Sequence, residues 1–464
     1  MREERPWFVS AVRLVVGATL VAAILMATVV YWTTFRTDLG QHERNPRVAA
    51  AAASPARGRI LDREGRVLAQ SRPDGGRAYA TAAAVHVVGY LSARYGSTGA
   101  ELAYHDELEG SAAGGWLDAL RTEFLRSSLR GKDVRLTIDL DVQLAAAEAL
   151  GARKGAVVAL DPQTGDVLAM VSWPNWDPNR FEELAPQLFQ DPDAPLLNRA
   201  TQGQYPPGST FKVVTAAAAL GEGIVTPDTL VSCDEAYVIH GYAISCGNVP
   251  QGPGTYPFRE AFAYSVNAVF ADIGVQVGWQ RLLEAAKAFG FGSDLGFPLP
   301  VTPSTVVGEG AQLDDVLLAS TAFGQGEIAV TPLQMAVVAA TIANGGLRPQ
   351  PRLLLQVESP DGSVRAPAPA EPIPALAREV AEALREMMVD VVRLGQADAA
   401  IPGVTVAGKT GTAETGRGTS HAWFIGFAPA EDPQVAVAVI VEDGGRGGAV
   451  AAPIARAVME AALR

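Results

Sequence analysis

The segments of this chain with strand character fall into two groups that are far apart in the sequence. Residues 155–172 have the pattern of a β-hairpin, because two runs rich in β-branched residues flank a turn at Pro162–Gly165. Three more short apolar segments, separated by polar turns, occupy 404–414, 421–429 and 434–443. A mostly helical stretch lies between the groups. Strands joined by short connections pair antiparallel, so we expect an α+β fold with one antiparallel five-stranded sheet, built from both groups and covered by helices.

An apolar run near the N-terminus predicts a membrane segment. Leu14–Trp32 carries no charge and approaches the ~20 residues that a bilayer-spanning helix needs. A cleaved signal peptide is the alternative, but the run is long for one and no clear cleavage site follows it. Arginines flank both ends, so charge leaves the orientation open. We predict a short tail over 1–13, a transmembrane anchor over 14–35, a small non-catalytic pedestal over 36–132 and the main domain over 133–464.

Composition narrows the kinds of partner. Hydrophobic residues make up 48% of the 464 residues and charged residues 19%, which is a globular balance. The net charge of −13 argues against nucleic acid, because phosphate contacts need clustered Lys and Arg. We also predict no cofactor and no metal. The two cysteines are Cys233 and Cys246. They would form a disulfide if the main domain lies outside the cytoplasm, and would be two buried thiols inside it.

The first pattern that suggests chemistry is S-x-x-K, formed by Ser209 and Lys212. Pro206–Gly208 precede it and an Ala-rich run follows, which predicts a helix starting at or beside Ser209. Positions i and i+3 share a helix face, so the Lys212 amine would lie against the Ser209 hydroxyl. A serine nucleophile needs a base, and burial with a second cation can lower a lysine pKa enough. Alone, the pattern is more often an N-cap serine with a solvated lysine.

The second pattern is S-x-N, formed by Ser265 and Asn267. Positions i and i+2 do not share a helix face, so both side chains enter one cleft only from a loop between helices. There Ser265 would pass a proton between Lys212 and a leaving amine, and Asn267 would hydrogen-bond a substrate amide. The alternative, a polar break between two core helices, is commoner when this pattern stands alone.

The third pattern is K-T-G on the strand at 404–414. Alternation sends Lys409 and Gly411 to one face, and Thr410 and Thr412 to the other. A cation with two hydroxyls suits a carboxylate, and Gly411 would let a ligand backbone approach. Backbone N–H groups of Thr412 and Ser209 would form an oxyanion hole. An ordinary lysine on a surface strand is the alternative.

The three patterns occur in the order known from β-lactamases and penicillin-binding proteins, each in the context that its role needs. Other segments carry the same resemblance: RGRILDREGRVLA, DVRLTIDLDVQ, GAVVALDPQTGDVLAMVSWPNWDPN, QYPPGSTFK, FGQGEIAVTPLQMA and HAWFIGFAP. Over nearly its whole length the chain resembles a class B penicillin-binding protein, most of all the short actinobacterial type. Val266 is a modest departure, because many relatives carry Cys or Asp there.

The resemblance implies a penicillin-binding/β-lactamase-like transpeptidase domain that cross-links peptidoglycan. Ser209 would be acylated by a stem peptide ending in D-Ala-D-Ala, and an amine of a neighbouring stem would take the acyl group. β-Lactams would acylate the same serine. Lys212 would be its general base, Ser265 a proton relay and Asn267 a holder of the donor. The donor carboxylate would be bound by the K-T-G strand: Lys409, Thr410, Gly411 and Thr412.

The resemblance also implies a location and a partner. The catalytic domain would lie outside the cytoplasm and the N-terminus inside. The family lacks a glycosyltransferase domain, so a membrane glycosyltransferase of the shape, elongation, division and sporulation family is the implied partner.

Three other functions fit parts of the pattern. A D,D-carboxypeptidase or a β-lactamase shares the triad but transfers the acyl group to water, so rapid penicillin turnover would favour it. A β-lactam receptor needs a cytoplasmic output domain, and about a dozen residues precede the apolar run. A catalytically dead scaffold conflicts with the intact motif residues.

Overall fold

The computed structural model describes residues 16–26, 28, 57–110, 131–247, 249, 252–416 and 418–464. The chain divides into two units, Met1–Ala56 and Arg57–Arg464. In the first unit residues 16–26 are helical, and the rest of the expected anchor over 14–35 lies almost wholly outside the described residues, as does all of the expected tail over 1–13. Among the residues described, we find no helix with both the length and the apolar character needed to cross a membrane.

The two groups of strands meet in one five-stranded antiparallel sheet of order β17-β18-β19-β7-β8. Its strands are β7 (Gly155–Leu160), β8 (Val167–Trp173), β17 (Ala407–Glu414), β18 (Ser420–Ala428) and β19 (Val435–Val441). The pairing of β19 with β7 joins the C-terminal strands to the early hairpin, with Val439 opposite Val157. β17 is therefore an edge strand, and its free edge is available to build a site.

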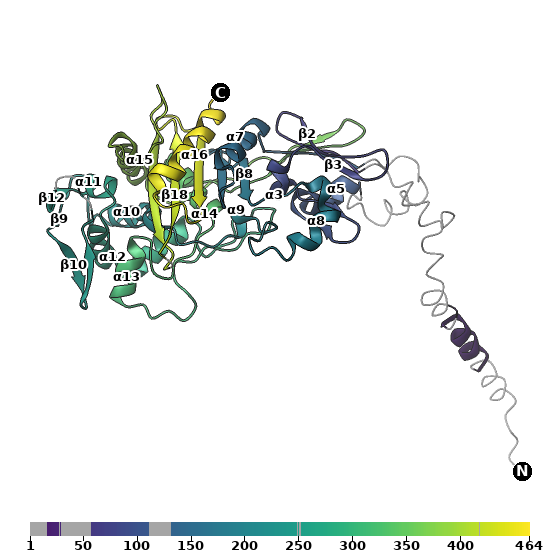
Figure 1. Cartoon of the computed structure of the whole chain (residues 1–464), viewed down its shortest axis with the longest axis horizontal. Helices are drawn as coiled ribbons and strands as arrows, with labels where there is room; N and C mark the ends of the chain where they lie inside the picture. Colours follow the sequence, from purple (N-terminus) through teal and green to yellow (C-terminus); the bar gives the residue numbers. More distant parts are fainter. Residues whose placement is uncertain are drawn as a thin grey trace, which may run out of the picture. The chain divides into compact units, whose positions relative to one another are not determined.

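Helices cover both faces of this sheet (Figure 1). Every residue of the central strand β19 is consequently buried. Helices α7 and α16 pack on each other and on the sheet, and α14 packs on its middle strands. The helices of this part are α7 (Leu140–Leu150), α8 (Phe181–Leu188), α9 (Arg199–Gln202), α10 (Lys212–Gly221), α11 (Phe258–Ala263), α12 (Asn267–Ala288), α13 (Asp315–Ala322), α14 (Pro332–Ala343), α15 (Arg378–Arg393) and α16 (Gly447–Ala462), with short 3-10 turns at η3 (Pro178–Arg180) and η4 (Gly208–Phe211).

A second, six-stranded sheet has the order β15-β14-β6-β1-β2-β3. Its strands are β1 (Ile60–Leu61), β2 (Val67–Ser71), β3 (Arg77–Tyr79), β6 (Asp133–Leu136), β14 (Leu354–Glu358) and β15 (Val364–Arg365). Beside it lie η2 (Ala82–Ala84), α3 (Val85–Val88), α4 (Gly99–Ala103) and α5 (His105–Glu109). β6 pairs parallel with β1 and antiparallel with β14. The sheet thus includes strands from both sides of the boundary expected at residue 132.

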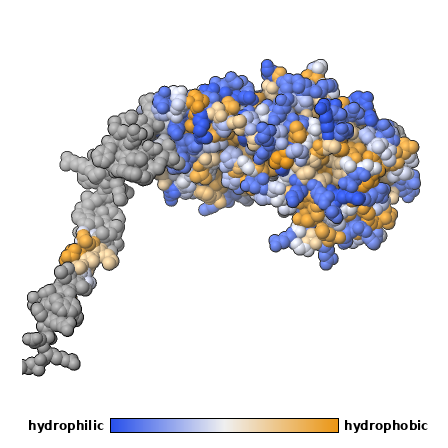
Figure 2. All heavy atoms as spheres, turned by 180° about the vertical axis from the view of Figure 1, so that it is seen from behind, coloured by the Kyte–Doolittle hydropathy of each residue, from blue (hydrophilic) through white to orange (hydrophobic). Residues whose placement is uncertain are grey.

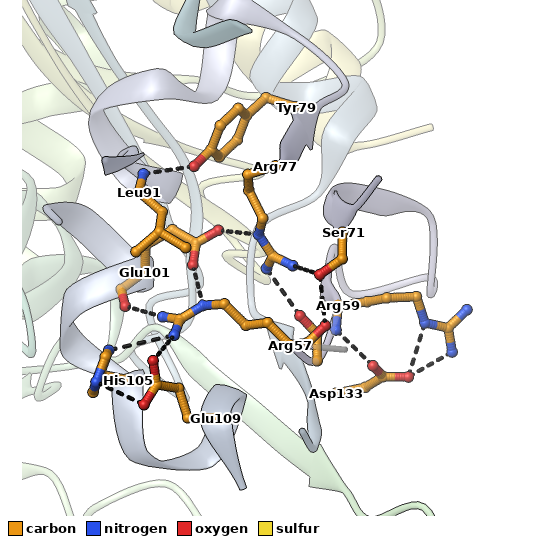
Figure 3. Close-up of polar contacts among 11 residues, drawn as sticks. Arg57, Arg59, Ser71, Arg77, Tyr79, Leu91, Glu101, His105, Glu109 and Asp133 are labelled. Carbon is orange, nitrogen blue, oxygen red and sulfur yellow. Dashed lines mark hydrogen bonds and ion pairs between the residues drawn. The ribbon is translucent and has the colours of Figure 1, made fainter. Parts of the chain in front are cut away.

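A buried ion network fastens the start of this unit (Figure 3). Glu101 is completely buried and accepts hydrogen bonds from Arg77 Nε at 2.6 Å and Arg57 Nε at 2.8 Å. Arg57 also donates to the Glu101 carbonyl at 2.6 Å, and Arg77 donates to the Gly58 carbonyl at 2.9 Å. Removing one partner would leave a buried charge without a counter-ion. The network therefore fixes the position at which the chain enters the unit Arg57–Arg464.

Small two-stranded sheets complete the described chain. They are formed by β4 (Leu91–Ser92) with β5 (Gly96–Ser97), β9 (Leu230–Cys233) with β12 (Gly254–Pro257), β10 (Ala236–Ile239) with β11 (Tyr242–Ser245), and β13 (Leu347–Arg348) with β16 (Ile373–Pro374). Cys233 and Cys246 form a disulfide at the base of the β10–β11 hairpin.

Candidate active site

The turn that carries Ser209 is fixed by two hydrogen bonds to the backbone of the residues just before the serine. Trp423 Nε1 donates to the Pro206 carbonyl at 3.0 Å, and the Gly208 N–H donates to the Gly324 carbonyl at 3.0 Å. Ser209 lies in the 3-10 turn η4, directly before α10, and is half-buried. Its hydroxyl has no hydrogen bond with the described part of the chain. A serine held this way, with a free hydroxyl, is positioned to react.

Lys212 is completely buried one turn after Ser209. Its Nζ lies 2.6 Å from the Ser265 carbonyl oxygen, 2.6 Å from Asn267 Oδ1 and 3.1 Å from Ser265 Oγ. The hydrogen bonds of Lys212 therefore go to the S-x-N loop. The reason is that the Ser265–Asn267 loop supplies carbonyl acceptors at the tip of the lysine.

Ser265 joins two lysines. It lies between α11 and α12 with a left-handed φ of 64°, which is uncommon for a residue other than glycine. Its Oγ lies 3.1 Å from Lys212 Nζ and 2.9 Å from Lys409 Nζ. The structure thus brings Lys212, Ser265, Asn267 and Lys409 together. The strained backbone turns both the carbonyl and the hydroxyl of Ser265 toward the lysines.

The electrostatics of the cluster follow from burial. Lys409 is also completely buried, and its burial lowers its pKa to about 7. Burial lowers the pKa of Lys212 well below its usual value, and the positive charge of Lys409 lowers it further. An aromatic ring lies near each lysine nitrogen. The ring centroid of Phe270 is 5.3 Å from Lys212 Nζ, and that of Phe262 is 5.7 Å from Lys409 Nζ. Burial and the nearby charge of Lys409 therefore both favour the uncharged amine of Lys212.

An uncharged Lys212 has the right hydrogen-bonding capacity for a base. Its two N–H groups match the two carbonyl acceptors, Ser265 O and Asn267 Oδ1. The nitrogen lone pair is then left to accept a proton. Lys409, as a cation, would donate to the Ser265 hydroxyl, whose oxygen lies 3.1 Å from Lys212 Nζ. Such a chain moves protons without moving heavy atoms.

The K-T-G strand β17 lies beside the serine turn. A side chain built on Gly208 would come within 3.0 Å of the Thr412 carbonyl oxygen. Gly411 faces the same turn, where a side chain would lie 2.8 Å from the Pro207 carbonyl oxygen and 3.0 Å from Trp423 Cβ. The serine turn and Trp423 thus leave no room for a side chain at position 411. Thr410 is half-buried and Thr412 is exposed, and the Thr412 hydroxyl accepts a long hydrogen bond from the backbone of α16, at 3.5 Å.

Several residues of the site carry no signal in the motifs. Tyr205 donates to Glu442 at 2.8 Å, and Arg199 donates to the same carboxylate oxygen at 2.7 Å, which fixes the loop before Ser209. Trp423 and Gly324 also fasten that loop. They lie in HAWFIGFAP and FGQGEIAVTPLQMA. These segments carry the family resemblance, but the sequence predicts no role for single residues within them. Among the described residues, no three His, Cys, Asp or Glu side chains are grouped as a metal site.

Comparisons with known proteins identify the family of the chain. The family described as penicillin binding protein transpeptidase domain matches residues 155–460, and the penicillin binding protein A dimerisation domain matches residues 57–134. The class of protein is therefore clear: the chain belongs to the penicillin-binding protein transpeptidase family.

Within that class the chain is similar to the mycobacterial proteins called peptidoglycan D,D-transpeptidase PbpA. It is 41% identical to the one from Mycolicibacterium smegmatis, over 97% of this chain and 98% of the relative. It is 39% identical to the one from Mycobacterium tuberculosis, over 97% of both chains. The ceftriaxone acyl-enzyme structure of penicillin-binding protein A from M. tuberculosis superposes with a TM-score of 0.82 at 39% identity, covering 89% of this chain and 99% of the other.

Proposed function

We propose that this protein is a serine-type peptidoglycan D,D-transpeptidase and a covalent target of β-lactams. Ser209 attacks the carbonyl carbon of the penultimate D-Ala of a donor stem peptide. The peptide bond to the terminal D-Ala breaks, and that D-Ala leaves as the free amino acid. The amine of a second stem then attacks the ester at Ser209, which forms the cross-link and releases the serine hydroxyl.

One observation carries the proposal: the Ser265 hydroxyl lies within 3.1 Å of two completely buried lysine nitrogens, one of them on the helix that directly follows the Ser209 turn. Lys212, held uncharged, removes the proton of Ser209. Ser265 delivers a proton to the departing amine, and Lys409 replenishes it. General acid–base catalysis of this kind contributes ~10²–10⁴ in rate.

Lys409 gives the pocket its preference for a donor that ends in a carboxylate. A buried cation is costly unless an anion or strong acceptors compensate it. The donor's terminal carboxylate supplies that charge, together with hydroxyls of Thr410 and Thr412 along β17. Asn267 keeps an amide N–H₂ for the donor backbone, because its carbonyl oxygen is occupied by Lys212. The N–H groups of Ser209 and Thr412 form the oxyanion hole.

The placement in the cell belongs to the same proposal. Residues 14–35 anchor the protein, with 1–13 in the cytoplasm and residues 133–464 outside, on a pedestal that begins near residue 36. A membrane glycosyltransferase of the shape, elongation, division and sporulation family supplies the glycan strands. The similarity to PbpA proteins over 97% of the chain supports this arrangement. A Ser363→Cys variant in intact cells should react with a membrane-impermeant maleimide; reaction only after lysis would reject this topology.

The reaction is tested by labelling with a fluorescent penicillin. The wild type and Ser363→Ala, which alters an exposed serine, should be labelled equally, and Ser209→Ala not at all. Mass spectrometry of the labelled protein should place the acyl group on Ser209. Equal labelling of Ser209→Ala would reject the nucleophile.

Transfer and hydrolysis are separated by the fate of a synthetic donor that ends in D-Ala-D-Ala. With an amine acceptor present, the wild type should form the amide product, and the penicillin ester should turn over slowly. Release of D-Ala with water as the sole acceptor, or rapid penicillin turnover, would favour a D,D-carboxypeptidase or a β-lactamase instead.

A further inference from the structure

A cavity of about 770 Å³ lies between helices α3 and α4 on one side and the 293–303 segment on the other. None of the residues that line it belongs to the cluster around Ser209 and Lys409. Its volume is in the range of sites that bind small molecules. Its walls are mostly apolar and aromatic, with Tyr90, Trp176 and Phe297 among them. The cavity therefore has the general chemistry of a ligand site.

The charges around the cavity restrict the ligand. The lining contains no lysine and no arginine, and a single carboxylate, Asp294. An anionic ligand would lose its hydration without gaining a cationic partner. His86 adds no charge, because burial lowers its pKa to about 4. The cavity therefore favours an uncharged molecule.

The polar groups of the lining would pair with a ligand that has both hydrogen-bond donors and acceptors. His86 is 8% exposed, and its Nε2 lies 2.8 Å from the Pro195 carbonyl oxygen, which makes Nε2 the N–H and Nδ1 an acceptor. Within the described part of the chain, Nδ1 has no hydrogen-bond partner. The side-chain amide of Gln202 also has none there, and it offers one carbonyl and one N–H₂.

A secondary amide on the ligand would match Gln202 with one donor and one acceptor, and a hydroxyl would donate to His86. Flat C–H faces would cover the aromatic rings. We propose that this cavity binds an uncharged N-acetylated amino sugar. The inference concerns a second site, apart from the residues around Ser209.

The cavity is also next to the structure that carries the nucleophile. Asn198 caps α9 by accepting from the Ala200 N–H at 3.1 Å, and its amide nitrogen lies 3.3 Å from the His86 carbonyl oxygen. The chain runs from Gln202, at the end of α9, directly into the loop before Ser209. A sugar in the cavity would thus be held by the same short helix that leads to the active-site turn.

Calorimetric titration of the full chain with tri-N-acetylchitotriose tests the proposal. The titration is carried out with the wild type and with Ser209→Ala, which should bind the sugar equally well. We expect saturable binding, and at least tenfold weaker binding of cellotriose, which has the same backbone without acetamido groups. Absence of saturable binding, equal binding of cellotriose, or tighter binding of an acidic trigalacturonate would overturn the assignment.

Variants place the sugar in this cavity. Ala103 is exposed in its lining, so Ala103→Trp should reduce the affinity at least tenfold. The control Ala366→Trp changes an exposed alanine outside the lining and should leave the affinity unchanged. Unchanged affinity in Ala103→Trp would overturn the site. If the thermal unfolding of Ala103→Trp shows a folding defect, Gln202→Leu decides: a tenfold loss supports the proposal, and full affinity rejects it.

Discussion

Replacing Ser265 by glycine tests the two roles of this residue separately. The hydroxyl contacts Lys212 Nζ at 3.1 Å and Lys409 Nζ at 2.9 Å, and the backbone has a φ of 64°. Glycine adopts that φ without strain. Ser265→Gly therefore removes the hydroxyl and leaves the backbone free to keep its conformation, so the carbonyl bond to Lys212 remains.

The loss of rate can be worked from the two contacts. The contact with the Lys409 cation contributes ~1.5–3 kcal/mol and the contact with the uncharged Lys212 ~0.5–1.5 kcal/mol. At ~1.4 kcal/mol for each tenfold change, the two together correspond to a loss of ~30-fold to ~10³-fold in the acylation rate. Stability should change much less. Relief of the left-handed strain, about 1–2 kcal/mol, offsets much of what the buried lysines lose in hydrogen bonding.

The assay is the second-order rate of acylation by a fluorescent penicillin, with urea unfolding measured on the same preparations. Ser265→Ala is the matched variant: it should acylate as slowly as Ser265→Gly but be ~1–2 kcal/mol less stable, because alanine keeps the strain. An acylation rate of Ser265→Gly within threefold of the wild type would refute the relay. A parallel collapse of rate and stability in both variants would reduce Ser265 to a structural residue.

Other predictions concern the surroundings of the site. Because burial lowers the pKa of Lys409 to about 7, the acylation rate constant should fall as pH rises above about 7 and the cation is lost; a pH profile of Lys409→Arg, which stays protonated, should lack this fall. The same lowered pKa means that folding releases a proton from Lys409, so urea unfolding should show stability increasing from pH 7 toward pH 10. Trp423→Phe leaves the Pro206 carbonyl without its donor and should cost ~1–3 kcal/mol in urea unfolding and slow acylation. Glu101→Gln leaves two buried arginines without their carboxylate and should lower the free energy of unfolding in urea by ~3–5 kcal/mol. Glu109→Gln, which alters a half-exposed carboxylate, should lower it by less than ~1 kcal/mol in the same measurement.

The central sheet could be predicted because its signals are local. The hairpin at 155–172 and the strands after 404 each show apolar runs bounded by turn residues, and short connections dictate their pairing. The pairing of β6 with β14 could not be predicted in this way. More than 200 residues separate Val134 from Val357, and neither strand carries a local mark of its partner. The expected boundary at 132 consequently falls beside a strand that belongs to the six-stranded sheet.

The candidate site shows the same division between local and distant information. Spacing within the chain singled out Ser209, Lys212 and Ser265, since helix periodicity and the loop requirement act over a few residues. Which acceptors the lysine reaches depends on the approach of α12, and this places Asn267 Oδ1 at 2.6 Å from Lys212. Trp423 illustrates the limit further, because a buried tryptophan in a strand reads as core, and its bond to Pro206 exists only in the folded chain.

Gly411 packs closely against the serine turn, a contact that the sequence did not indicate. The sequence pattern predicts that the missing side chain leaves space for a ligand backbone, as an edge strand next to a site would allow. In the structure the space is filled by the Pro207 carbonyl oxygen, which a side chain at 411 would meet at 2.8 Å, and by Thr210 Cγ2 at 3.1 Å. The glycine therefore sets the distance between β17 and the serine turn. Since the oxyanion hole is proposed from one N–H on each of these two elements, that distance governs the chemistry even though no ligand atom need touch Gly411.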